Sequence, residues 1–135
     1  MSPFFMLALL LALTPFDYAM LAKTVKVEAA PNTFDEYCVV ASVLNRVEHS
    51  KFPNTVRGVV LAPGQFEGDV WGASADPAIV ARLRSPEGKK KILKALDILD
   101  GRTDFKGQSM LRYRVPGEDP MCHPKGNFYH YYWQS

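Results

Sequence analysis

The sequence predicts an α+β domain, in which a mainly helical body is followed by a small β-hairpin or sheet at the C-terminal end. Up to about residue 100, apolar side chains recur every three or four positions, which is typical of buried helical faces. Residues 111–115 instead alternate between apolar and charged side chains, which is typical of a strand. The chain has 135 residues, of which 47% are hydrophobic and 22% charged, so one compact domain can hold both parts.

The first element is an unbroken apolar run over residues 4–13. Its length suits the hydrophobic region of a secretory signal, but no Lys or Arg precedes it and no small-residue cleavage site follows it. Two interpretations stay open. Residues 1–13 are either an export or anchor segment, with transient membrane contact through residues 4–13, or an N-terminal helix that packs on the core.

Two helices are recognised by the residues that begin them. Residues 14–17 (TPFD) supply a hydroxyl cap, a proline at the first helical position and a carboxylate three residues after the cap, so a helix begins there. It ends before Pro31, because the residue before a proline is disfavoured in a helix. Thr33 and Glu36 predict a capping box for a second helix. The apolar positions of that helix are Tyr37, Val40, Ala41, Leu44 and Val47.

Later segments are marked by prolines, glycines and a change of period. They are a short segment at 54–61, a helix beginning at Asp76-Pro77, a helix from Ser85-Pro86 to Gly101 with a buried stripe of Ile92, Leu96 and Leu99, and strands at 111–115 and 128–133.

Charge and cysteine content exclude some classes of function. A net charge of +2 is too small to indicate a nucleic-acid partner, and no apolar stretch is long enough to span a bilayer as a helix. Cys38 and Cys122 either pair in an oxidising compartment or leave Cys38 as a free thiol buried in its helix. A zinc site built from these cysteines with His123 and His130 does not match the usual ligand spacing, so we predict no metal and no cofactor.

Glu28 is the main candidate for acid/base chemistry, because it lies in the last turn of the helix that residue 14 caps. There its carboxylate faces the negative end of the helix dipole, which disfavours the charged form by about 0.3–1 kcal/mol. If the bend at Pro31 lines an apolar cleft, desolvation raises the pKa of Glu28 further, as a general acid requires. Position alone favours the alternative of a solvated surface glutamate.

Five short motifs follow one another around and after Glu28. They are residues 27–29 (VEA), 39–47 (VVASVLNRV), 52–56 (FPNTV), 58–60 (GVV) and 63–66 (PGQF). In this order and spacing the chain resembles cell wall hydrolases of the spore-cortex-lytic (SleB/CwlJ-like) type. The resemblance covers residues 17–133. It begins after the apolar run, which favours the export or anchor interpretation of residues 1–13 and makes residues 14–135 the catalytic domain.

The resemblance implies a lysozyme-like domain that cleaves the bond between N-acetylmuramic acid and N-acetylglucosamine in peptidoglycan, with Glu28 as the catalytic acid/base. No second carboxylate stands in a matching motif, which favours lytic transglycosylation over hydrolysis. The enzyme would be a monomeric bacterial or phage lysin that acts outside the cytoplasm: secreted, periplasmic or in the cell wall, or, for a phage, at the host envelope or in the virion. The implied substrate contacts are Asn45, Arg46, Gln65, Phe66, Tyr113 and His130.

Some residues depart from the family pattern or allow other roles. Pro31 and Asn32 stand where relatives carry Gly and a second Glu, which leaves open a non-catalytic peptidoglycan-binding or virion structural protein on the same fold. Arg46 has the alternative of a surface ion pair with Asp35 or Glu48, which would contribute little to stability. An amidase or peptidase would need a metal or a Cys–His pair.

Overall fold

The computed structural model describes residues 3–29, 31–48, 52–62, 72–99 and 122. Within these ranges every element is an α-helix and none is a strand, so the predicted α+β class is wrong. The physical reason is that the apolar side chains of the helices bury one another in a single cluster, which has no sheet in it. Both predicted strands, 111–115 and 128–133, lie outside the described residues. The helices are α1 (Pro3–Ala12), α2 (Pro15–Glu28), α3 (Asp35–Val47), α4 (Val56–Leu61), α5 (Pro77–Arg84) and α6 (Pro86–Leu99).

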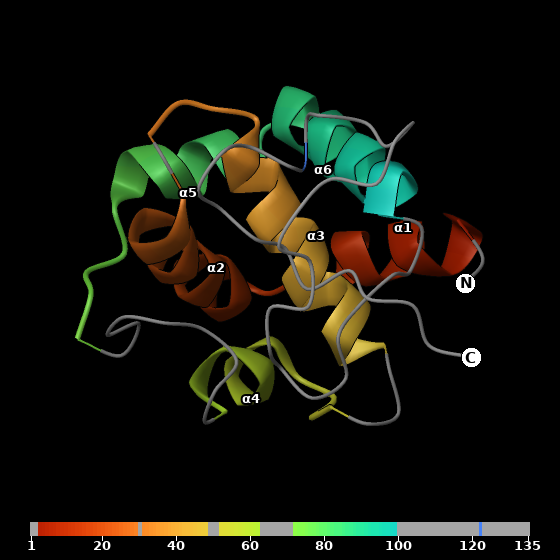
Figure 1. The fold of residues 1–135 in the computed structure, drawn as a ribbon, viewed down its shortest axis with the longest axis horizontal. Coiled ribbons are helices and arrows are strands. Elements are labelled where there is room, and N and C mark those ends of the chain that lie inside the picture. The colour runs from red at the N-terminus through yellow and green to blue at the C-terminus, as the bar shows by residue number, and fades with distance from the viewer. Residues whose placement is uncertain (1–2, 30, 49–51, 63–71, 100–121, 123–135) are drawn as a thin grey trace.

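The helices are arranged around α3, which runs through the middle of the molecule in Figure 1. It contacts α6, α2 and α4, while α5 packs on α2 and α6, and α1 packs on α6. All thirteen residues of α3 are buried, including the apolar positions that the sequence predicts. The sequence indicates one buried face for this helix, whereas the structure surrounds it on every side.

The start of α2 confirms the predicted capping box. The backbone N–H of Asp17 donates to Oγ1 of Thr14 at 3.1 Å, and the N–H of Thr14 donates to Oδ2 of Asp17 at 2.9 Å. At the start of α3 the structure differs from the prediction. The N-cap is Phe34 rather than Thr33, and the hydrocarbon side chain of Phe34 makes no cap hydrogen bond.

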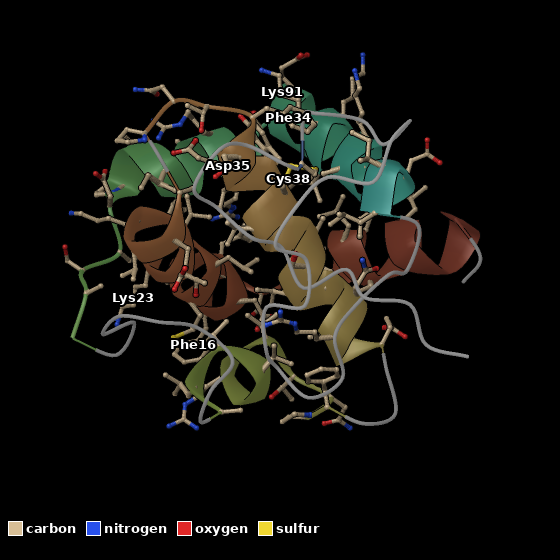
Figure 2. The ribbon with its side chains drawn as sticks, viewed as in Figure 1. Phe16, Lys23, Phe34, Asp35, Cys38 and Lys91 are labelled. Atoms are coloured by element: carbon tan, nitrogen blue, oxygen red, sulfur yellow. A yellow bond between two sulfur atoms is a disulfide. The ribbon has the colours of Figure 1, made fainter. Side chains whose placement is uncertain are left out.

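The first turns of α3 pack against α6. Figure 2 shows Phe34, Asp35 and Cys38 at this end of α3, beside Lys91 of α6. The ring of Tyr37 lies 5.7 Å from that of Phe34, measured between centroids, and the Lys91 ammonium lies 5.5 Å from the Tyr37 centroid. Aromatic and cation–π contacts therefore join the N-terminal end of α3 to α6.

The corner between α5 and α6 contains one residue, Ser85. Its hydroxyl accepts from the N–H of Gly88 and donates to the carbonyl oxygen of Arg82, both at 2.9 Å. A Cβ on Gly88 would lie 1.9 Å from that same carbonyl oxygen, so only glycine permits the two helices to approach so closely. The predicted helix starts at Asp76-Pro77 and Ser85-Pro86 are confirmed.

Residues in the apolar N-terminal run form α1. Leu10 is 1% exposed and enters the core, whereas Leu7 and Leu11 are 40% and 65% exposed. No helix in the ranges that the structure describes is long and apolar enough to cross a membrane. The export or anchor role of residues 1–13 stays a prediction.

Cys38 and Cys122 form a disulfide, with Cα atoms 5.6 Å apart. The sequence left open whether Cys38 pairs or stays a free thiol, and the structure shows the pair. The bond ties residue 122 to the first turn of α3 across 84 residues of sequence. It is therefore a long-range covalent link to the central helix.

Candidate active site

Glu28 is the last residue of α2. The helix ends there because Ala29 turns to an extended conformation, with φ of −123°, while its N–H still donates to the carbonyl of Val25 at 2.9 Å. The Glu28 side chain is half-buried and its Oε1 atom is buried. A carboxyl group at the end of a helix, with one oxygen shielded from water, is a candidate for acid/base chemistry.

The connection that follows Glu28 is tied to the first turn of α3. Asn32 has a φ of 59°, in the left-handed region, and among the described residues it is the one non-glycine residue with positive φ. Asparagine tolerates this conformation better than most residues do. Its backbone N–H donates to Oε2 of Glu36 at 3.4 Å. The family resemblance leads us to expect a second glutamate at position 32. In this chain the backbone at position 32 is instead hydrogen-bonded to a carboxylate of α3, that of Glu36.

Glu36 is paired with Arg82 of α5 through two parallel hydrogen bonds. Arg82 Nη2 donates to Oε2 at 2.9 Å, and Nε donates to Oε1 at 3.2 Å. Glu36 is 1% exposed, whereas the Arg82 side chain is 32% exposed. The hydrogen bond with Glu36 raises the pKa of Arg82 above its ordinary value, so the guanidinium stays charged. The sequence offered no signal for this pair, because its members are 46 residues apart.

Asn45 and Arg46 lie together near the C-terminal end of α3. They are 2% and 1% exposed, so Arg46 does not lie at the surface, where the ion-pair alternative places it. The guanidinium of Arg46 lies over the ring of Phe52, with Cζ 5.7 Å from the centroid. At 1.5 Å of rise per residue, Asn45 is about 15 Å along the helix from Asp35, where the connection from Glu28 arrives.

Two polar side chains on α3 have hydrogen-bonding capacity that nothing among the described residues uses. The atoms are Oγ of Ser42 and Nδ2 of Asn45, and both are buried. Residues three apart lie on the same side of a helix, so Ser42 and Asn45 share one side of α3. Buried polar atoms are usually hydrogen-bonded, so these two atoms are exceptions to the general rule.

The other predicted contacts, Gln65, Phe66, Tyr113 and His130, lie outside the described residues. Within the part of the chain that is described, no three His, Cys, Asp or Glu side chains converge in a way that could hold a metal ion.

Comparison with known proteins identifies the family. A family model described as Cell Wall Hydrolase matches residues 33–131, which is well over half of the chain. The matched region begins after Glu28 and contains all six predicted substrate contacts. No curated protein and no solved structure matches the chain. The helical domain built around α3 thus belongs to the cell wall hydrolase family and is an enzyme domain that acts on peptidoglycan.

Proposed function

We propose that this domain cleaves the glycan strands of peptidoglycan between N-acetylmuramic acid and N-acetylglucosamine, as a lytic transglycosylase with Glu28 as its acid/base. The observation that carries the proposal is the place of Glu28 at the C-terminus of α2, with Oε1 buried. Glycoside cleavage requires a carboxyl group that donates a proton to the leaving oxygen, and in this proposal Glu28 supplies it.

In the proposed reaction the protonated Glu28 donates to the glycosidic oxygen as its bond to the muramic acid C1 breaks. The resulting carboxylate then takes the proton of the 6-hydroxyl of the same sugar while that oxygen attacks C1. The product is a 1,6-anhydro ring, and Glu28 returns to its starting form. One carboxyl group completes the cycle, whereas hydrolysis ordinarily uses two.

The pairing of Glu36 with Arg82 supports lytic transglycosylation over hydrolysis. Both of its carboxylate oxygens receive hydrogen bonds from Arg82, and the carboxylate is buried. A carboxylate held in this way is a poor nucleophile or base, because attack would require it to leave a charge-assisted bidentate contact. Glu28 would therefore act without help from this neighbour in sequence.

For binding of the strand we propose Asn45 and Arg46, together with Gln65, Phe66, Tyr113 and His130. The unused Nδ2 donor of Asn45 supports a role in hydrogen bonding to the sugar. The substrate is the glycan strand, with no nucleic-acid partner and no cofactor, and the enzyme acts as a monomer.

We place the enzyme outside the cytoplasm, in the periplasm or cell wall or, if it is encoded by a phage, at the host envelope or in the virion. The Cys38–Cys122 disulfide supports this location, because such bonds persist in oxidising compartments. The exposed Leu7 and Leu11 of α1 support transient membrane contact through residues 4–13.

The test compares wild type, Glu28→Gln and a control, Glu87→Gln, on purified peptidoglycan. Glu87 is an exposed glutamate in the first turn of α6 and has no place in the proposed reaction. Mass spectrometry of the released fragments should show anhydro-muramyl ends with wild type and Glu87→Gln, and none with Glu28→Gln. Reducing ends would indicate hydrolysis, and new amino groups would contradict glycan cleavage. Wild-type binding without release would indicate a non-catalytic wall-binding protein.

A further inference from the structure

We propose that the Glu36–Arg82 pair is the positioning device for Glu28: it holds the connection that follows α2 and thereby fixes the direction of the Glu28 carboxyl. This inference rests on the proposed role of Glu28. In this inference Glu36 and Arg82 do not touch the substrate. They act on Glu28 through the backbone of Asn32.

The first step is the shortness of the connection. Asn32 is four residues after Glu28, and its N–H is bonded to Glu36. Four residues span at most about 14 Å even when fully extended, so an anchor at Asn32 limits the positions open to the end of α2. The N–H of Ala29 still donates to the carbonyl of Val25 at 2.9 Å, so the chain leaves α2 from a bonded position.

The second step is the rigidity of the anchor itself. The guanidinium of Arg82 is a planar fork, and its two bonds fix both oxygens of Glu36 in one plane. The backbone of Arg82 is held in turn, because its carbonyl accepts from the Ser85 hydroxyl and packs against Gly88. The position of the Glu36 carboxylate is therefore set by the corner between α5 and α6.

The third step concerns the backbone at Asn32. A φ of 59° is a conformation that most residues avoid, and it persists where surrounding contacts enforce it. The Glu36 carboxylate bonded to this N–H is such a contact. A displacement of about 1 Å in a catalytic group can lower the reaction rate about a hundredfold. A contact that holds the backbone at Asn32 in place would therefore affect the rate through the position of Glu28.

The experiment measures kcat and KM per folded protein for Arg82→Gln and Arg82→Lys, with Arg84→Gln as the matched control. Arg84 lies on the same helix and stacks over Tyr18, with Cζ 5.4 Å from the ring centroid, outside the pair. Folded protein is quantified by circular dichroism below each variant's melting temperature. We expect Arg82→Gln to lower kcat by about ten- to a hundredfold with KM nearly unchanged, and Arg82→Lys, which keeps the charge but loses the fork, to lower it less.

The control should retain wild-type kcat. If Arg82→Gln does not fold, Arg82→Lys decides the question by the same readout. A wild-type kcat in the folded Arg82 variants would overturn the inference, as would a rise in KM alone. Glu28→Gln is assayed in parallel. If it stays active, the proposed function fails and takes the inference with it, whereas an inactive Glu28→Gln beside fully active Arg82 variants refutes the positioning role alone.

Discussion

The guanidinium of Arg46 stacks on the ring of Phe52 in the interior of the protein. Their exposed fractions are 1% and 8%, so the cation is shielded from water by an aromatic face. Arg46 belongs to the Leu-Asn-Arg triplet at the end of α3, and Phe52 opens the Phe-Pro-Asn-Thr segment before α4. Two motifs that the sequence presents separately are thus in contact in the fold.

Removing the Phe52 ring should destabilise the domain strongly. We expect Phe52→Ala to lower the free energy of unfolding by about 3–5 kcal/mol, because it leaves a cavity beneath a buried cation. Phe52→Leu should cost about 1 kcal/mol, since it keeps most of the volume but loses the cation–π contact. Urea denaturation measures both. Phe16→Ala is the control, because Phe16 is 54% exposed. Equal losses at Phe16 and Phe52 would contradict the described packing.

Breaking the disulfide should lower the free energy of unfolding by about 4–5 kcal/mol, because the bond closes a loop of 84 residues in the unfolded chain. Denaturation of wild type with and without a thiol reductant should reveal this difference. The variant Cys38→Ala/Cys122→Ala should match reduced wild type and should not respond to the reductant. A reductant-insensitive wild type would show that Cys38 and Cys122 do not pair.

Tyr18 should make the stability of the wild type fall at alkaline pH. Its side chain is 4% exposed, and burial raises its pKa above 10.0, against the opposing effect of Arg84. As pH rises past 10.0, the unfolded tyrosine loses its proton while the folded one keeps it. The unfolded state then binds fewer protons, so stability decreases with pH.

The matched variant is Tyr18→Phe, which lacks the titrating hydroxyl. The Tyr18 Oη is buried and has no hydrogen-bond partner among the described residues, so at neutral pH we expect equal or slightly higher stability, by up to about 1 kcal/mol. Urea unfolding at pH 8 and at pH 10.5 should show the advantage of the variant increasing with pH. An advantage that is constant or shrinks would refute the raised pKa.

Features encoded by neighbouring residues were predictable from the sequence. The start of α2 at Thr14 and its end at Glu28 depend on caps and prolines within a few positions. The predicted α+β class depended on two short segments, and short periodic runs are weak evidence about a core that the helices bury among themselves. In the same way, Glu36 matched a local capping pattern in the sequence. In the structure its carboxylate accepts two charge-assisted hydrogen bonds from Arg82, which is 46 residues away.

In the candidate site, too, the features set by neighbouring residues were predictable and those set by distant contacts were not. Glu28 could be placed at a helix end from sequence alone, and the structure has it there. The burial of Asn45 and Arg46 could not be foreseen, because a helical pattern assigns polar residues to the solvent side. Pairing of Cys38 with Cys122 was equally open, since connectivity depends on which segments meet in space.

The complete burial of α3 has a consequence for how the protein tolerates mutation. A surface helix has positions at which almost any polar residue is accepted, and they recur with the helical period. None of the thirteen residues of α3 has such latitude, because each has neighbours on its own side. In a saturation mutagenesis scan, we therefore expect substitutions to be poorly tolerated at every position of this helix. Substitutions at Ser42 or Asn45 should be as poorly tolerated as those at Val40 or Leu44.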